Sequence, residues 1–308
     1  MYKVSAIITT CKREAAIVER AVQSVLNQTY SCKEVIIVDD SPEEFVGRIE
    51  VEKVINKLRL QSSIEIIYIK HDKCKGACAA RNTGLDNSCG EIIGYLDDDD
   101  EWCENKVERL IGAFDDESIG LVYCNYIRHD DKTGEERKIK VKDCCDNAYE
   151  HLIIHNSIGG TSFPLLRRTA IKSAGKFDTE MMSVQDLDLW LRISQKYRIK
   201  YVDEYLVIYH THDGEQISTN LFKRFMGLKR INEKNCQYLS AHPDAFYKRN
   251  IKLVPYYAKS NQKRKAVKLL GACIKAKPTS VALNLRYIFV ILCSKKNDQL
   301  CQQIYGEQ

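Results

Sequence analysis

The stretch "EIIGYLDDDDEW", Glu91 to Trp102, places four consecutive carboxylates directly after an apolar run. The run resembles a short buried strand. Neighbouring unit charges about 6 Å apart repel by roughly 1 kcal/mol or less in water, and by several times that near a protein surface. Hard divalent ions such as Mg²⁺ or Mn²⁺ remove this repulsion and commonly share their shell with substrate phosphates. A solvated acidic turn is the alternative, but the carboxyl end of a strand is where open α/β sheets bind ligands, which favours a metal–phosphate site.

Outward from this stretch, the first half of the chain alternates strand and helix patterns. Such alternation implies right-handed crossovers and an α/β fold with a mainly parallel sheet. Strands are expected at residues 3–10, 34–40, 64–70 and 91–96, with helices at 14–28, 43–60 and 76–85 between them.

Polar side chains follow three of these strands: Thr9 with Arg13 just beyond, Asp39 with Asp40, and 97–100. Such strand ends converge on one crevice in a doubly wound sheet. Carboxylates and an arginine there suit a nucleotide diphosphate and its cation. Neither GxGxxG nor GxxxxGK[ST] follows the first strand, which removes the usual dinucleotide and P-loop signatures.

From about residue 121 the pattern becomes mixed. A strand-like "LVYCNYI" is followed by a polar insertion at 128–142, a Gly-containing loop at 155–168 that leads into a short strand, and a helix within 183–197. Asp186 lies near the start of that helix, where negative charge is favourable. Residues 199–212 have strand character and end near two histidines.

Charge divides the 308 residues unevenly. Residues 221–308 hold 18 Lys and Arg against 4 Asp and Glu (+14), whereas residues 1–220 hold 29 against 38 (−9). An acidic body and a basic tail predict a catalytic domain at 1–220 and a basic, helical extension at 221–308. The 13 cysteines show no zinc-like paired spacing and no signal peptide is recognised, so we expect reduced thiols in a cytoplasmic protein.

Five segments together resemble the family-2 inverting glycosyltransferases of the GT-A fold, the type found in bacterial polysaccharide synthesis. They span about residues 3–220: "VSAIITTCKRE", "EVIIVDDSP", "KGACAARNTGLDNSCGEIIGYLDDDDEW", "GKFDTEMMSVQDLDLWLRI" and "YHTHDGEQIS". The resemblance implies a metal-dependent transferase that moves sugar from a nucleotide-diphosphate sugar, expected to be a UDP-sugar, to a glycan or lipid-linked acceptor.

The resemblance also implies roles for individual residues. Asp39 would contact the uracil, and the residues expected beside the nucleotide or its ribose are Thr9, Cys11, Arg13, Arg81, Asp97 and Asp98. Asp99 would bind Mn²⁺ or Mg²⁺, His212 matches a histidine near the metal or phosphates, and Asp186 matches the catalytic base.

Four of these residues have a plainer interpretation. Asp186 could be a helix cap, and His212 a hydrogen-bonded surface histidine. Arg13 could be a solvated charge, and Arg81 could brace the acidic run as a salt bridge. Asp188 is more typical of a structural residue.

The chain also departs from the family pattern. Gln185 stands where relatives usually carry Glu, and Cys11 and Lys12 replace a common Tyr-Asn pair. No Gln-x-x-Arg-Trp motif of processive synthases is seen, so transfer of a single sugar is expected.

Two other functions fit part of the pattern. A nucleotidyltransferase would also use a metal-bound nucleotide, but "ITTCKRE" lacks the glycines that such enzymes usually carry after the first strand. A non-catalytic nucleotide-sugar-binding subunit would not need both Asp99 and Asp186. A nucleic-acid partner for the basic tail is not expected, because no recognised motif accompanies it.

The tail combines apolar helix faces with dense positive charge. One predicted helix carries Ala266, Leu269, Leu270, Cys273 and Ile274 on one face, and Val281–Cys293 follows as a mostly apolar segment. The second segment is too short to span a bilayer, which takes about 20 apolar residues. Either a packed helical bundle or a helix at the membrane interface fits residues 261–296, so peripheral contact with the inner face of the cell membrane is one expectation.

Overall fold

The structure is a computed structural model that describes residues 2–211, 220–295 and 297–305. The chain forms two compact units, each described here by itself. Unit 1 comprises residues 1–152, 156–179 and 186–213, and unit 2 comprises 153–155, 180–185 and 214–308. The domain division at residue 220 stays a prediction.

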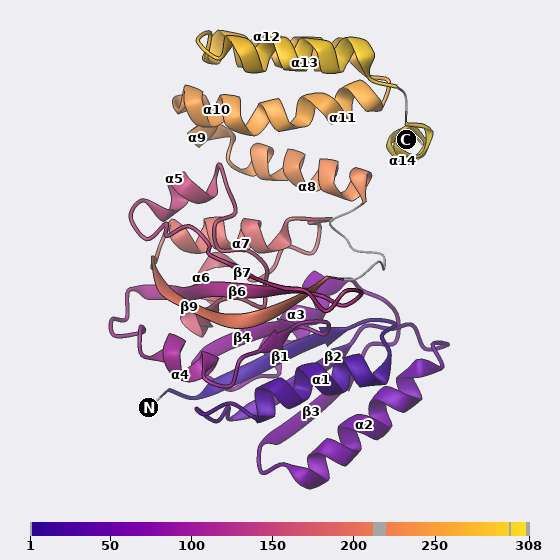
Figure 1. The fold of residues 1–308 in the computed structure, drawn as a ribbon, viewed down its shortest axis with the longest axis vertical. Helices are drawn as coiled ribbons and strands as arrows, with labels where there is room; N and C mark the ends of the chain where they lie inside the picture. The colour runs from indigo at the N-terminus through magenta and orange to yellow at the C-terminus, as the bar shows by residue number, and fades with distance from the viewer. Residues whose placement is uncertain (1, 212–219, 296, 306–308) are drawn as a thin grey trace. The chain divides into compact units, whose positions relative to one another are not determined.

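Unit 1 is built on one mixed sheet with the strand order β3-β2-β1-β4-β8-β6-β9-β5, and β7 pairs with β6 at the side (Figure 1). β1–β4 are parallel, as are β6 and β9, whereas β8 and β5 run antiparallel to their neighbours. The strands are β1 (Val4–Thr10), β2 (Glu34–Asp39), β3 (Glu65–Lys70), β4 (Ile92–Asp97), β5 (Glu101–Trp102), β6 (Ile119–Asp130), β7 (Glu136–Ile139), β8 (Leu165–Arg167) and β9 (Arg198–Thr211).

Helices flank this sheet. They are α1 (Ala15–Leu26), α2 (Gly47–Gln61), α3 (Ala77–Asp86), α4 (Lys106–Ile111), α5 (Ala148–Leu152), α6 (Arg168–Ala174) and α7 (Gln185–Ser194). The expected α/β class with a mainly parallel sheet is therefore confirmed.

Strand β1 is buried along almost its whole length because helices cover both of its faces. Ala6 and Ile8 belong to the same core cluster as Val18 of α1, whereas Ile7 faces Gly84 of α3. A Cβ atom at Gly84 would lie 2.4 Å from Cγ2 of Ile7, so only glycine lets α3 approach this closely. This close packing places the start of α3 beside the carboxyl ends of the central strands.

Unit 2 is helical. Its elements are α8 (Leu221–Lys234), α9 (Cys236–Ala241), α10 (Pro243–Asn250), the 3₁₀ helix η2 (Ile251–Leu253), α11 (Val254–Lys259), α12 (Lys263–Ala276), α13 (Val281–Cys293) and α14 (Asp298–Tyr305). The predicted apolar face of α12 is confirmed, since Ala266, Leu270 and Cys273 are buried against α10 and α11 residues. In the described part of the chain, no helix is long and apolar enough to cross a membrane.

Candidate active site

The four aspartates form a tight turn between β4 and β5. Asp97 ends β4 directly opposite Thr9 of β1, and the amide of Asp100 donates to the carbonyl of Asp97 at 3.0 Å. Ser162 holds both ends of the turn: its hydroxyl accepts from the Asp97 amide (3.1 Å) and donates to Oδ2 of Asp100 (2.6 Å). The turn is therefore held in place by a residue of a second loop.

Trp102 packs beneath this turn and anchors it to the loop that carries Ser162. Trp102 donates from Nε1 to the carbonyl of Ser162 at 3.1 Å. Its ring packs over Gly94, where a Cβ would lie 2.4 Å from the ring. The sequence "GYLDDDDEW" thus needs both its glycine and its tryptophan to set the direction in which the carboxylates emerge.

Arginines contact three carboxylate side chains of the turn. Arg13 donates from Nε to Oδ1 of Asp98 (3.1 Å) and from Nη2 to Oδ2 of Asp99 (3.0 Å). Arg81 donates from Nη2 to Oδ1 of Asp97 at 2.7 Å. Arg81 therefore braces the acidic turn, and Arg13 is more than a solvated charge.

These arginines do not balance the negative charge. Burial raises the pKa of Asp98, with Asp99 adding to the rise and Arg13 opposing it. Burial also raises the pKa of Asp100 well above its usual range, and the charges of Asp97 and Asp99 raise it further. Carboxylates in this state gain from a further cation, and oxygen ligands are those that Mg²⁺ and Mn²⁺ prefer. The carboxylates of the turn thus fit a divalent ion, and the assignment of Asp99 as its ligand stays a prediction.

Asp186 lies in the first turn of α7, inside the helix rather than at its cap. Asn156 donates from Nδ2 to Oδ2 of Asp186 at 2.7 Å. Burial raises the pKa of Asp186, which the Leu187 amide, Asn156 and Arg81 oppose and Asp97 reinforces. Asp186 therefore shares one electrostatic environment with the acidic turn, and its basicity exceeds that of an ordinary aspartate.

Asp188, two residues further along α7, has a different environment. It is buried, and its Oδ2 accepts from Nε (2.9 Å) and Nη2 (2.7 Å) of Arg192. This closed ion pair is the arrangement of a structural residue. Gln185, which replaces the usual glutamate, donates to the carbonyl of Met181 at 3.1 Å.

The two aspartates at the carboxyl end of β2, Asp39 and Asp40, are enclosed by protein donors. Asp39 is 1% exposed. Its carboxylate accepts hydrogen bonds from the Tyr68 hydroxyl (2.6 Å) and the Ser41 amide (2.8 Å). It also lies 3.3 Å from Nε of Arg48. A uracil would have to share or displace one of these partners. The expected contact with uracil stays a prediction.

Asp40 organises the loop that enters α3. It accepts from His71 Nδ1 and from the amides of Lys75 and Gly76, each at 2.7 Å. These donors lower the pKa of Asp40 although burial opposes them. Asp40 therefore has a structural role in shaping the loop before "GACAARNTGL".

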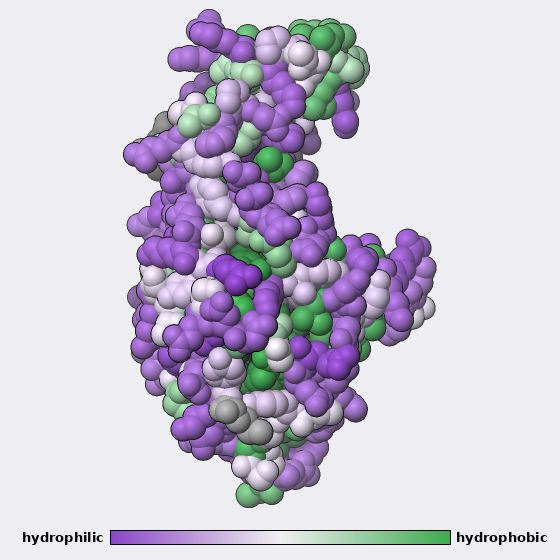
Figure 2. Space-filling view, turned by 90° about the vertical axis from the view of Figure 1, so that its left-hand side faces the viewer, coloured by the Kyte–Doolittle hydropathy of each residue, from purple (hydrophilic) through white to green (hydrophobic). Residues whose placement is uncertain are grey.

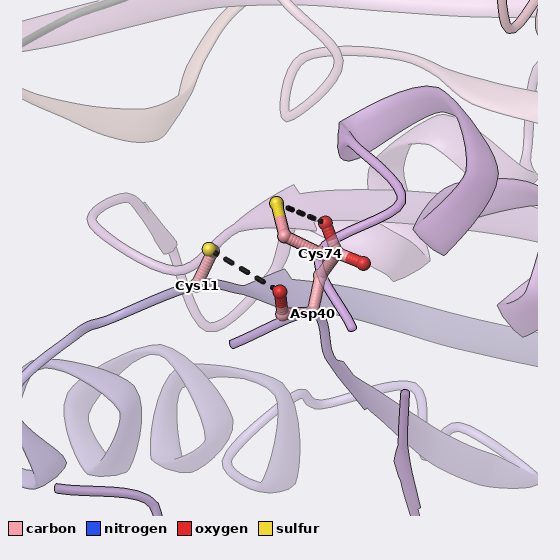
Figure 3. Close-up of side chains that lie close together, drawn as sticks. All are labelled: Cys11, Asp40 and Cys74. Carbon is pink, nitrogen blue, oxygen red and sulfur yellow. Dashed lines mark hydrogen bonds between the residues drawn. The ribbon is translucent and has the colours of Figure 1, made fainter. Parts of the chain in front are cut away.

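Cys11 lies at the edge of the same region (Figure 3). Its Sγ is 3.4 Å from the carbonyl of Asp40, and Sγ of Cys74 is 3.3 Å from Oδ2 of Asp40. Burial raises the pKa of Cys11 to about 12, and Cys74 adds to the rise. All cysteines are free thiols in the structure, and the raised pKa of Cys11 keeps its thiol protonated at neutral pH.

Several of the residues that shape the site were not identified from the sequence: Asn156, Thr161 and Ser162 on the loop before β8, and Arg20 on α1. Thr161 donates to both oxygens of Asp97 at 2.9 and 3.0 Å, and Arg20 donates to the carbonyl of Asp99 at 2.8 Å. The only signal for the loop was its Gly-Gly-Thr-Ser composition. His212 lies outside the described residues.

Comparisons with known proteins identify the family and the fold. The family model described as Glycosyl transferase family 2 matches residues 5–175. The Escherichia coli protein named UDP-Glc:alpha-D-GlcNAc-diphosphoundecaprenol beta-1,3-glucosyltransferase WfaP is 31% identical over 211 residues, which cover 67% of this chain and 76% of WfaP.

Two solved structures share the fold. The crystal structure of S. aureus TarS 1-349 in complex with UDP-GlcNAc gives a TM-score of 0.62 at 14% identity, covering 93% of this chain and 92% of that one. The mannosyltransferase PcManGT from Pyrobaculum calidifontis, in complex with GDP-Man and Mn²⁺, gives 0.60 at 17% identity, covering 100% and 88%. With its mixed sheet and its acidic turn beside Asp186, the chain belongs to glycosyl transferase family 2 and has the GT-A fold.

Proposed function

We propose that this glycosyltransferase inverts the anomeric centre and moves a single sugar from a UDP-sugar to a hydroxyl of a glycan or lipid-linked acceptor. The observation that carries the proposal is the placement of Asp186, a partly buried carboxylate with a raised pKa, in the electrostatic environment of Arg81 and Asp97. The name of WfaP, with a UDP-Glc donor and a diphosphoundecaprenol acceptor, and the UDP-GlcNAc complex of TarS support the choice of donor and acceptor.

Asp186 acts as the general base in this proposal. Inverting transfer is one in-line displacement, and its base must come within about 3 Å of the acceptor hydroxyl. Asp186 takes the hydroxyl proton as the oxygen attacks the anomeric carbon, while Asn156 holds the carboxylate in place through the 2.7 Å hydrogen bond. The raised pKa makes the carboxylate a better proton acceptor near neutral pH.

The donor binds on the strand-end side of the site. Thr9, Cys11 and Asp39 line the uracil pocket, and Arg81, Asp97 and Asp98 lie toward the ribose and phosphates. Arg13 contributes positive charge next to the departing diphosphate. Asp99, together with His212, would hold Mn²⁺ or Mg²⁺. Such an ion, when bound, serves as a Lewis acid for the leaving diphosphate.

A screen of nucleotide sugars by thermal shift, with and without Mn²⁺, tests the donor assignment. The bound donor should raise the melting temperature by mass action, and UDP-sugars should exceed GDP-sugars. Products separate this proposal from a nucleotidyltransferase, because sugar transfer releases UDP whereas transfer from a nucleoside triphosphate releases pyrophosphate. Binding without turnover on every acceptor tried would favour a non-catalytic subunit.

Replacement of the base tests the mechanism directly. Asp186→Asn should bind donor normally and lose transfer by about 10²-fold or more. Asp188→Asn is the matched control, since it removes a carboxylate two residues away that forms an ion pair with Arg192. Equal losses in the two variants would contradict the assignment of Asp186.

We also propose that α13 lies on the cytoplasmic membrane surface, where a lipid-linked acceptor would be found. Phe289 and Leu292 are 66% and 71% exposed, and the helical spacing places Val281 and Leu285 on the same face. Figure 2 shows hydrophobic surface at the top of the view, where α12 and α13 lie. The neighbouring α12 supplies the positive charge that anionic lipids attract, at about 1 kcal/mol for each Lys or Arg near the surface.

Flotation with anionic vesicles at low salt tests this contact. The full chain should float, and the double variant Phe289→Ser with Leu292→Ser should not. The control replaces two apolar residues that are even more exposed, Val46 just before α2 and Leu60 within it. The variant Val46→Ser with Leu60→Ser should float like the parent. Failure of the parent to float, or equal flotation of all three proteins, would exclude α13 as the contact.

A further inference from the structure

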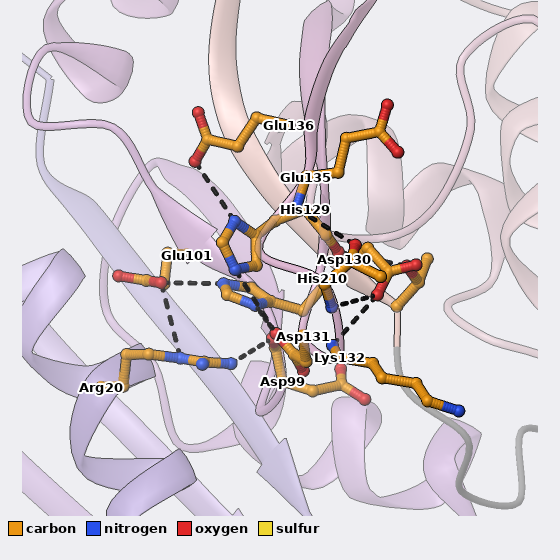
Figure 4. Close-up of polar contacts among 12 residues, drawn as sticks. Arg20, Asp99, Glu101, His129, Asp130, Asp131, Lys132, Glu135, Glu136 and His210 are labelled. Carbon is orange, nitrogen blue, oxygen red and sulfur yellow. Dashed lines mark hydrogen bonds and ion pairs between the residues drawn. The ribbon is translucent and has the colours of Figure 1, made fainter.

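A second group of potential metal ligands lies beside the acidic turn and outside the donor site described above. It consists of His129 on β6, Asp131 just after β6, and His210 on β9, here called the histidine cluster (Figure 4). β6 and β9 are parallel neighbours, and their register pairs His129 directly with His210. One ligand atom from each residue lies within 4.8 Å of the other two.

The inner nitrogens of both histidines face the same carboxylate. Nδ1 of His210 is 2.5 Å from Oδ1 of Asp131, and Nε2 of His129 is 3.9 Å from the same oxygen. Tetrahedral Zn²⁺ with bonds of about 2.0–2.2 Å keeps its ligand atoms about 3.3 Å apart. One of the two observed nitrogen–oxygen distances is shorter than this value and the other is longer. Rotation of the Asp131 carboxylate would lengthen the first and shorten the second.

The outer nitrogens of both histidines face further carboxylates. Nε2 of His210 is 2.8 Å from Oε1 of Glu101, and Nδ1 of His129 is 3.2 Å from Oε1 of Glu136. Metal-binding histidines nearly always give their second ring N–H to a carboxylate, carbonyl or water, which fixes the tautomer and the ring orientation. Here both histidines have that arrangement, each supplied by a different strand.

We propose that His129, Asp131 and His210 bind a divalent transition metal of the Zn²⁺ class, with Glu101 and Glu136 orienting the two imidazoles. Two nitrogens and one carboxylate oxygen form the ligand set of an open zinc site whose remaining position is taken by water. Imidazole favours Zn²⁺ over Mg²⁺, which prefers oxygen ligands such as those of the acidic turn. The two sites therefore differ in ligand chemistry.

Metal at the histidine cluster would brace the acidic turn. The His210 amide donates to Oδ1 of Asp100 at 3.3 Å. Arg20 links Glu101, 3.5 Å from its Nε, to the carbonyl of Asp99 at 2.8 Å. Fixing His210 and Glu101 therefore restrains the turn through contacts other than those of Arg13, a positioning role that does not depend on the sugar or acceptor proposed above.

Zinc binding by tag-free, chelator-treated full-length protein tests the proposal. Titration calorimetry with ZnCl₂ should show one site that His129→Ala weakens by about 10-fold or more. Glu136→Gln should weaken it by about 10–100-fold, the range for residues that orient ligands. His242→Ala, which removes an exposed histidine from unit 2, is the control and should bind as the parent does. Glu136 is largely exposed, so its variant remains informative if His129→Ala unfolds.

Cys11, Asp40 and Cys74 form a competing group of possible ligands, and Co²⁺ distinguishes the two. Cobalt at the histidine cluster should lack thiolate charge-transfer absorption and should be unaffected by Cys74→Ser. A thiolate band lost in Cys74→Ser would overturn the proposal, as would absence of zinc binding by the parent or equal zinc affinity in the parent, His129→Ala and Glu136→Gln. That last result would leave a protonated His210 between two carboxylates as the explanation of the contacts.

Discussion

Replacement of Lys106 by methionine should stabilise unit 1. Lys106 is fully buried at the start of α4, and its Nζ has no hydrogen-bond partner in the described part of the chain. Burial lowers its pKa from 10.5 to about 8. At about 1.36 kcal/mol per pH unit, this fall corresponds to about 3 kcal/mol of destabilisation by the charge at neutral pH.

One contact opposes this gain. The ammonium lies 4.0 Å from the ring centroid of Trp102, and a desolvated contact of this type contributes about 2 kcal/mol. Methionine keeps a similar length and a favourable sulfur–ring contact of about 0.3–1.5 kcal/mol. Lys106→Met should therefore raise the free energy of unfolding by about 1–3 kcal/mol at pH 7.

The pH dependence gives a second check with a definite sign. Below about pH 8 the lysine is protonated in both states, so the advantage of the variant is complete. Between about 8 and 10.5 the unfolded chain binds the proton and the folded chain does not, so the parent gains stability with pH and the difference shrinks.

Urea unfolding at pH 7 and pH 9.5, followed by tryptophan fluorescence in reductant, measures both effects. Trp102 and Trp190 both belong to unit 1, so the signal reports on that unit alone. Lys172→Met, at an exposed position of α6, should change stability by less than about 0.5 kcal/mol. A variant less stable than the parent at pH 7, or a difference that does not change with pH, would refute the reasoning.

Three further predictions concern the site. Asp99→Ala should abolish the Mn²⁺-dependent part of UDP affinity by calorimetry, and affinity equal to the parent's would exclude Asp99 as a ligand. Because burial raises the pKa of Asp186, kcat/KM should fall as pH decreases through a midpoint above the usual aspartate value of about 4, and a profile flat down to pH 4 would contradict a base of this kind. Asp188→Asn should lower the free energy of unfolding by about 1–3 kcal/mol, because the Arg192 ion pair is lost. The folded variant should keep kcat within about tenfold of the parent's. An unchanged free energy of unfolding in denaturant would show that the pair is not structural.

The sequence predicted the elements whose pattern is local. Buried parallel strands appear as continuous apolar runs, so β1, β2 and β4 and the polar residues that end them could be recognised. Strand β7 could not, because Glu136–Ile139 is exposed and charged and is ordered by backbone pairing with β6. The polar insertion expected at 128–142 is in fact partly a hairpin.

Residues brought together only by the sheet register were beyond local patterns. His129 and His210 are far apart in the chain, and no spacing motif joins them. They meet because β6 and β9 pair in parallel over their whole length, with irregularities near Cys124 and Asn125 that shift the register. Asn156 and Asp186 were also beyond local patterns, because their hydrogen bond depends on the course of the loop before β8.

Two strands of this sheet end in adjacent aspartates, and their physical states differ. Asp40 after β2 is held by a histidine and two amides, and these donors lower its pKa. Asp98 and Asp100 after β4 have raised pKa values, because burial and their neighbouring carboxylates outweigh the donors around them. A carboxylate whose charge is already matched gains little from a cation, whereas an unmatched group gains much. The position of an acidic pair at a strand end therefore does not by itself select a metal site, and the balance of charge around it favours the turn after β4.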